Sequence, residues 1–220
     1  HYPLRRQRQM CIRDSGKSTL INLIPRYYDV TKGSVKVDGV DVRDMTQKEL
    51  RDKLGYVPQK GVLFSGTIDS NIRYGKPEIT DAQVKEAAEV AQATEFIDTK
   101  PEKYESPVSQ GGTNVSGGQK QRLSIARAIA KDPEIFIFDD SFSALDFKTD
   151  SQLRKALKEY TKDATTVIVA QRISTILGAD QIIVLDDGHM AGIGTHKELM
   201  ANCEVYQQIA RSQLSEEELA

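Results

Sequence analysis

The stretch 134–140, EIFIFDD, limits the possible folds of this chain more than any other feature. Its four consecutive apolar residues leave no polar face, which is typical of a parallel strand covered on both sides. Segments that favour helices lie before and after it, VSGGQKQRLSIARAIA and TDSQLRKALKEY, and a second apolar run, TTVIVAQ, follows. Strands that alternate with helices predict an α/β fold with a mainly parallel sheet.

Local patterns predict the remaining elements. The segment TDAQVKEAAEVAQA begins with a capping box of Thr80 and Gln83, and it places several apolar side chains on one helical face. Asp-Gly pairs at 38–39 and 187–188 lie between alternating segments and predict two hairpins. We also expect a short strand in GYVPQ, a short capped helix in THKELM, and a helix in GKSTLINLIPRYYD that ends near Pro25.

Composition excludes several classes of protein. The chain has 220 residues and a formal net charge of −2, so it offers no broad electrostatic attraction to nucleic acid. Its two cysteines, Cys11 and Cys203, form neither a disulfide framework nor a metal-binding spacing. No apolar run approaches the roughly 18 residues of a membrane-spanning helix. His189, His196 and Cys203 are interpreted as surface or packing residues.

The string Ser15-Gly16-Lys17-Ser18-Thr19 matches the second half of a phosphate-binding P-loop. Backbone N–H groups at the start of a helix favour phosphate, Lys17 would reach the β- and γ-phosphates, and Ser18 would hold Mg²⁺. The full pattern requires a glycine five places before Gly16, where this chain has a cysteine. A short string of this kind is a weak signal when it stands alone.

The residues before this string suggest why the first half does not match. HYPLRRQRQMCIRDS back-translates to a DNA string that resembles the transposase end sequence used in library preparation. We therefore expect residues 1–15 to be a translated sequencing adaptor, which would have replaced the N-terminal strands and the first half of the P-loop. The alternative is a natural basic arm, and a P-loop that is truly broken.

Two further segments carry candidate chemistry. Asp139 ends the buried run FIFDD, and an acid at the end of a strand near a P-loop commonly binds Mg²⁺. In VSGGQ, Ser116 and Gln119 have capping-box spacing. The two glycines between them would let the backbone approach a phosphate closely at a second helix N-terminus.

From Gly16 to about Arg211 the chain resembles the nucleotide-binding domain of ATP-binding-cassette (ABC) transporters. VSGGQ is similar to the family signature, YVPQ to the Q-loop, SALD (143–146) to the D-loop, and LFSGTIDSNIRYG to a segment typical of exporters. The resemblance implies a RecA-like P-loop NTPase core, with a helical subdomain at about 60–134 and an acidic tail at 212–220. It implies ATP and Mg²⁺ as cofactors, and it assigns binding residues: Ser15, Gly16, Lys17, Ser18, Thr19, Gln59, Ser116, Gly117, Gly118, Gln119 and Asp146 for ATP, with Ser18, Gln59 and Asp139 for the metal.

The chain departs from the family pattern at the residues that cleave ATP. Asp140 stands where the family has glutamate, and Gln171 stands where it has the switch histidine; with Gln59 these are the candidate catalytic residues. Aspartate is one methylene shorter, about 1.5 Å, and glutamine cannot take up a proton. Gln110 also replaces an acid that exporters usually carry. The pattern resembles the degenerate half of a heterodimeric exporter, which retains binding residues while its own hydrolytic site is impaired.

The resemblance implies two partners, a second nucleotide-binding domain and the membrane domain of an exporter, at the cytoplasmic face of the plasma membrane. It implies no nucleic acid. Two alternatives remain open: a soluble ABC ATPase of the DNA-repair type, and a nucleotide-free module that only offers its signature to a partner. Without the first half of the P-loop and an aromatic residue for adenine, the chain as written is expected to bind ATP weakly.

Overall fold

A computed structural model describes residues 16–214, which divide into two compact units. One unit holds residues 24–168, and the other holds residues 16–23 together with residues 169–214. Each unit has a buried apolar cluster, and strands alternate with helices along the chain. The expected adaptor and most of the acidic tail lie outside the described residues, so both remain predictions.

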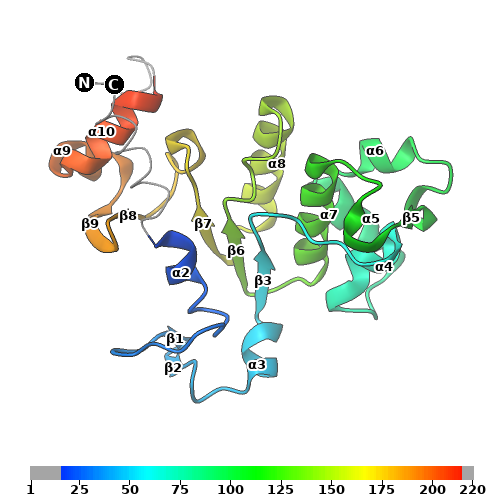
Figure 1. Cartoon of the computed structure of the whole chain (residues 1–220), viewed down its shortest axis with the longest axis horizontal. Coiled ribbons are helices and arrows are strands. Elements are labelled where there is room, and N and C mark those ends of the chain that lie inside the picture. Colours follow the sequence, from blue (N-terminus) through cyan, green and yellow to red (C-terminus); the bar gives the residue numbers. More distant parts are fainter. Residues whose placement is uncertain (1–15, 215–220) are drawn as a thin grey trace. The chain divides into compact units, whose positions relative to one another are not determined.

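The larger unit is built on a sheet whose strand order is β3-β6-β7. These strands are β3 (Leu54–Val57), β6 (Ile135–Asp139) and β7 (Thr165–Val169). β3 and β6 are parallel, and β6 lies between the other two strands (Figure 1). Phe136, Ile137 and Phe138 are at most 1% exposed, although successive side chains point to opposite faces. The predicted central, doubly covered strand is therefore confirmed.

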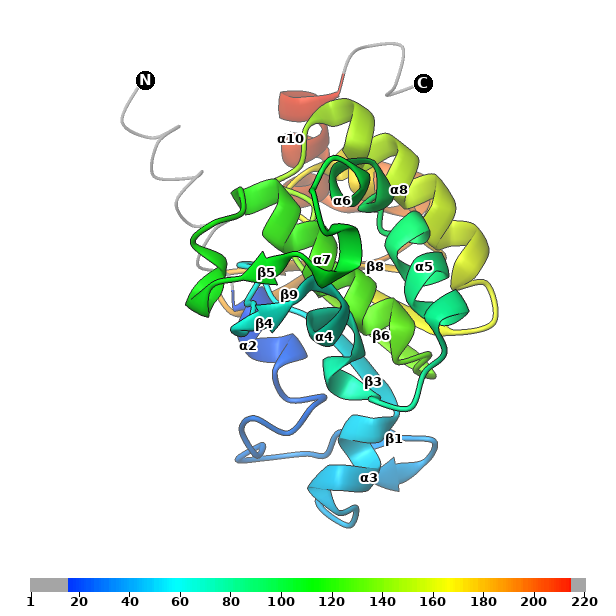
Figure 2. The ribbon, with the colours of Figure 1, turned by 90° about the vertical axis from the view of Figure 1, so that its right-hand side faces the viewer.

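A cluster of helices lies beside β3, and within it α4 and α5 pack against α7 (Figure 2). They are α4 (Ile68–Ile72), α5 (Asp81–Val90), α6 (Thr94–Asp98) and α7 (Gly117–Ala130), followed after β6 by α8 (Phe147–Tyr160), and a small antiparallel pair, β4 (Gly66–Thr67) and β5 (Pro107–Val108), lies among them. The predicted capping box opens α5, where the Thr80 side chain accepts from the Gln83 N–H. The predicted apolar face of α5 is buried through Val84, Ala87 and Ala88.

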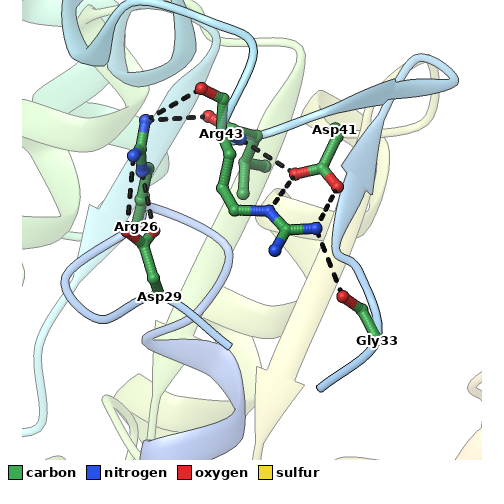
Figure 3. Close-up of polar contacts among 6 residues, drawn as sticks. Arg26, Asp29, Gly33, Asp41 and Arg43 are labelled. Atoms are coloured by element: carbon green, nitrogen blue, oxygen red, sulfur yellow. Dashed lines mark hydrogen bonds and ion pairs between the residues drawn. The ribbon is translucent and has the colours of Figure 1, made fainter. Parts of the chain in front are cut away.

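Charged side chains hold the first part of this unit together (Figure 3). The segment contains β1 (Lys36–Val37), β2 (Val40–Asp41) and α3 (Gln47–Asp52). The Arg43 guanidinium donates to Asp41 Oδ2 at 2.7 Å and to the Gly33 carbonyl at 3.2 Å. Arg26 pairs with Asp29 at 2.7 Å and also donates to the carbonyls of residues 42 and 43. Two arginines thus tie the loop before β1 to β2 and to the residues directly after β2.

The bond from Arg43 lowers the pKa of the Asp41 carboxyl to about 2. The pKa of an aspartate in the unfolded chain is about 3.9. This pairing therefore stabilises the fold above that pH, and the stabilisation is lost as the pH falls toward 2. Asp41→Asn should therefore lower the midpoint of thermal unfolding slightly at pH 7, and the difference from wild type should shrink below pH 4. Thermal unfolding between pH 7 and pH 3 measures it, with the exposed Asp163→Asn as control. A difference that stays constant with pH would contradict the assignment.

The smaller unit is built around a hairpin of β8 (Ile182–Asp186) and β9 (His189–Gly194). The helices of this unit are α2 (Lys17–Ile21), α9 (His196–Asn202) and α10 (Glu204–Gln213), and the unit also contains the 3₁₀ turn η4 (Ile173–Thr175). Asp187 and Gly188 have φ of 46° and 75°, as the type I′ turn of a tight hairpin requires. The pair 38–39 has the same signs, so both predicted hairpins are confirmed.

One predicted helix is shorter than expected. The pattern GKSTLINLIPRYYD predicts a helix that continues to about Pro25, but α2 ends at Ile21 with Asn22 as its C-cap. A proline disfavours the helical conformation in the residue before it and cannot donate a helical hydrogen bond. The apolar side chains of Leu23 and Ile24 therefore follow the helix as a turn instead of extending its face.

Candidate functional site

Two buried carboxylates stand at the end of the central strand. Asp139 is 6% exposed and Asp140 is 8% exposed. The Gln59 side chain, in the loop after β3, donates through Nε2 to Asp140 Oδ2 at 3.1 Å. The Tyr56 hydroxyl donates to Asp139 Oδ2 over a long 3.4 Å. The structure therefore brings together three predicted site residues, Gln59, Asp139 and Asp140, and adds a tyrosine.

The parallel pairing of β3 with β6 explains this meeting. Because Val57 is opposite Phe138, the two strands end at the same edge of the sheet. The Ser141 hydroxyl then donates to the Val57 carbonyl at 2.9 Å, which ties the residues after β6 to the end of β3. Burial and the nearby Asp139 carboxylate raise the pKa of the Tyr56 hydroxyl, so this group remains a donor at neutral pH.

Asp140 has an unusual backbone conformation, with φ of 47°. Few residues other than glycine adopt this left-handed region, and aspartate and asparagine do so more readily than others. The Ser143 hydroxyl donates to the Asp140 carbonyl at 2.9 Å and stabilises the turn. The sharp turn directs the chain from β6 into the segment 143–146.

The predicted signature opens α7 with a complete capping box. The Ser116 Oγ accepts from the Gln119 N–H at 3.2 Å, while the Gln119 side chain accepts from the Ser116 N–H at 3.1 Å. A Cβ added at Gly117 would meet nothing within 4 Å, so the backbone there is open to a ligand. At Gly118 it would lie 3.5 Å from the Ala144 carbonyl, so the signature contacts the segment 143–146.

Asp146, predicted to act at ATP, is the N-cap of α8. Its Oδ1 accepts from the Thr149 N–H at 2.9 Å, and its Oδ2 accepts from the Thr149 hydroxyl at 2.7 Å. The backbone bond from Thr149 is the main reason that the pKa of this carboxyl is lowered. The cap gives Asp146 a structural task, and its contact with ATP stays a prediction.

The predicted P-loop residues 16–19 and Gln171 lie in the smaller unit. Gly16 is the N-cap of α2 with φ of 84°, and Lys17, Ser18 and Thr19 form the first turn of that helix. Since glycine has no side chain, the N–H groups of this turn are not covered by a cap from Gly16. Ser15 lies outside the described residues.

The backbone around Gln171 is held by a residue that the sequence did not indicate. The Gln213 side chain, in α10, donates through Nε2 to the Gln171 carbonyl at 2.9 Å. Its Oε1 accepts from the Ile173 N–H at 2.8 Å. One amide thus fixes the chain on both sides of Arg172. Gln213 is 42 residues from Gln171, and no local pattern links such distant positions.

Comparison with known proteins identifies the family. The family model described as "ABC transporter" matches residues 14–143, more than half of the chain. The chain belongs to the ABC transporter family. An ATP-bound structure of a bacterial Atm1-family ABC exporter matches with a TM-score of 0.88 and 40% identity, over 92% of this chain and 36% of the exporter chain. The P-loop NTPase fold predicted for this ABC domain is thereby confirmed.

Two groups of relatives in sequence agree with this result. An "Uncharacterized ABC transporter ATP-binding protein" of Mycobacterium tuberculosis is 49% identical over 202 residues, which cover 90% of this chain and 34% of the relative. A "Putative multidrug export ATP-binding/permease protein" of Staphylococcus aureus is 48% identical over 194 residues, which cover 88% and 34%. The ABC domain thus spans about a third of the curated relatives that it matches. Among residues 16–214, none of the helices is long and apolar enough to span a membrane.

The side chains of the ABC domain fit ATP and Mg²⁺. Mg²⁺ takes oxygen ligands and is commonly held by one or two carboxylates together with phosphates, which suits Asp139 at the strand end. Within the described part of the chain, no group of three or more His, Cys, Asp or Glu side chains could hold a metal by itself. The open backbone at Gly117 and the glycine N-cap of α2 both suit phosphate.

Proposed function

We propose that this ABC domain binds ATP with Mg²⁺ and powers an exporter, and that its own P-loop site is hydrolytically impaired. The observation that carries the proposal is the buried Asp140 carboxylate, which follows Asp139 and accepts a bond from Gln59. An acid occupies the position of the catalytic glutamate, but its carboxylate is about 1.5 Å short of where glutamate would place it. Gln171, a neutral amide, stands at the position of the switch histidine.

Each residue has a definite task in this proposal. Residues 15–19 hold the phosphates of ATP, and Ser18, Asp139 and Gln59 hold Mg²⁺. When bound, Mg²⁺ neutralises charge on the phosphates. Asp140 and Gln59 orient the attacking water, and the shorter reach of the acid at this position makes the step slow.

The signature and D-loop serve the facing domain. In this proposal, Ser116–Gln119 and Asp146 complete an ATP site on a second nucleotide-binding domain, which is a different half-transporter. The membrane domain is the other partner, and the assembly lies at the cytoplasmic face of the plasma membrane. The similarity to a putative multidrug export protein and to an Atm1-family exporter supports this proposal over a soluble ABC ATPase.

The first experiment is Mg²⁺-dependent binding of ATP to the complete exporter that contains this domain. Lys17→Ala should weaken ATP binding at this site about 10–100-fold, because a charge-assisted bond to phosphate contributes about 1.5–3 kcal/mol. Lys197→Ala, an exposed lysine of α9, is the matched control and should leave binding unchanged. Equal binding by wild type and Lys17→Ala would contradict the proposal. An absence of ATP at this site in wild type would favour the nucleotide-free module.

A further inference from the structure

Gln121 is a buried glutamine that joins two parts of the larger unit. It lies in α7, less than two turns after the signature, and is 1% exposed. Its Oε1 accepts from the Gly61 N–H at 2.9 Å, and its Nε2 donates to the Pro58 carbonyl at 3.1 Å. One side-chain amide thus binds both ends of the loop 58–61, which follows β3 and lies 60 residues away in sequence.

The backbone of this loop also packs directly against α7. A Cβ at Gly61 would lie 2.8 Å from the Lys120 carbonyl oxygen and 2.9 Å from the Ser124 Oγ. Contacts this short do not occur, so any side chain at this position would push the loop away from the helix. The loop and the helix therefore make contact at a site that only glycine permits.

Gln59 lies between the two anchored positions. Because Pro58 and Gly61 are both held by Gln121, the backbone of Gln59 has little freedom to shift. Its side chain extends to Asp140, where Nε2 donates to Oδ2 at 3.1 Å. An unbroken series of contacts therefore runs from the signature cap at Ser116, along α7, to the carboxylate of Asp140.

We propose that Gln121 is a positioning residue, which clamps the loop 58–61 on α7 so that the Gln59 amide stays at Asp140. This inference rests on the proposed function of Gln59 and Asp140. The signature and Gln59 serve opposite sites of the assembly in that proposal. The signature at the start of α7 serves the ATP site of the second domain. If α7 shifts there, the clamp therefore moves Gln59 at the ATP site of this chain.

Gln121→Leu removes both bonds and keeps the approximate volume of the side chain. In the complete exporter, hydrogen exchange of a peptide covering residues 58–62 should become about tenfold faster, since losing two neutral bonds costs about that factor. ATP turnover at this chain's site, measured with the other site inactivated, should fall about tenfold, while KM changes less than about twofold. The matched control is Gln207→Leu, which removes a side-chain bond to the Met200 carbonyl in the other unit and should change neither quantity.

A double-mutant cycle separates positioning from a general structural role. If Gln121 acts through Gln59, then Gln121→Leu should lower turnover less than about twofold when Gln59→Ala is already present. Gly61→Ala, which retains the Gln121 amide but pushes the loop from α7, should show the same dependence on Gln59 and serves if Gln121→Leu fails to fold.

The clamp would be overturned if Gln121→Leu lowered ATP turnover equally in the wild-type and Gln59→Ala proteins. Unchanged hydrogen exchange in the peptide 58–62 would overturn it as well. If wild type binds and turns over ATP while Gln121→Leu behaves identically, only this inference fails. If wild type neither binds nor turns over ATP at this site, the proposed function fails and the inference with it.

Discussion

Asp140→Glu combined with Gln171→His is expected to raise ATP turnover at this chain's own site by about 10²–10⁴-fold. A well-placed general base typically contributes that factor, and glutamate restores the missing methylene while histidine restores a group that can carry charge. The Gln59 amide is already beside the carboxylate at 3.1 Å, so the surroundings of a longer acid are in place. The measurement is ATP turnover by the complete exporter that contains this domain, with the facing site inactivated.

Asp140→Asn is the control, because it retains the size of the side chain and removes the base. It should abolish the residual turnover of this site. The left-handed backbone at residue 140, with φ of 47°, favours aspartate over glutamate, so Asp140→Glu should also destabilise the fold slightly. No gain in turnover from the double substitution, in a protein that folds and binds ATP, would show that the site is not limited by these two residues.

Ser116→Asp is expected to leave helix α7 intact and to lower ATP turnover strongly at the facing site, the one on the second nucleotide-binding domain. The Ser116 Oγ accepts from the Gln119 N–H, and aspartate caps helices as well as serine does. The serine hydroxyl can still donate its proton outward to a phosphate, whereas an aspartate carboxylate has no proton to donate and repels the anion. Turnover at the facing site should fall about 10²–10³-fold, the usual result of losing one preorganised donor, while thermal unfolding stays unchanged.

Two further variants make this result specific. Ser116→Ala should lower both turnover and stability, the latter by about 1 kcal/mol, because it removes the cap as well as the donor. Thr195→Asp alters the same kind of capping box at α9 and should leave turnover unaffected. If Ser116→Asp and Thr195→Asp lower turnover equally, the Ser116 hydroxyl has no role at the nucleotide.

The features that could be predicted from sequence are those determined by neighbours in the chain. The capping boxes at Thr80 and Ser116 each span only four residues, and the Asp-Gly hairpins need only the two turn residues and the alternation around them. The run at 135–138 predicts a doubly covered strand because its composition leaves no polar face. The meeting of Gln59 with Asp140 needed the family resemblance as well, since it depends on which strands pair.

The remaining features depend on contacts between distant residues. Gln121 and Gln213 are ordinary glutamines in sequence, and only the fold shows that each binds backbone groups on both sides of a loop. The predicted length of α2 was wrong, because the prediction followed the apolar spacing up to Pro25. It gave too little weight to the effect of this proline, which disfavours the helical conformation in the residue before it. The tasks of residues 16–19 and Gln171 remain predictions.

The arginine pairs of Figure 3 imply that residues 26–43 respond more strongly to ionic strength than the buried apolar cluster around α7 does. Residues 26–43 are joined by Arg26 with Asp29 and by Arg43 with Asp41, whose side chains are between 15% and 52% exposed. Salt screens exposed pairs of this kind but hardly affects buried apolar contacts such as those around α7. In concentrated salt we therefore expect a protease to cleave residues 26–43 first, while the helices around α7 resist cleavage.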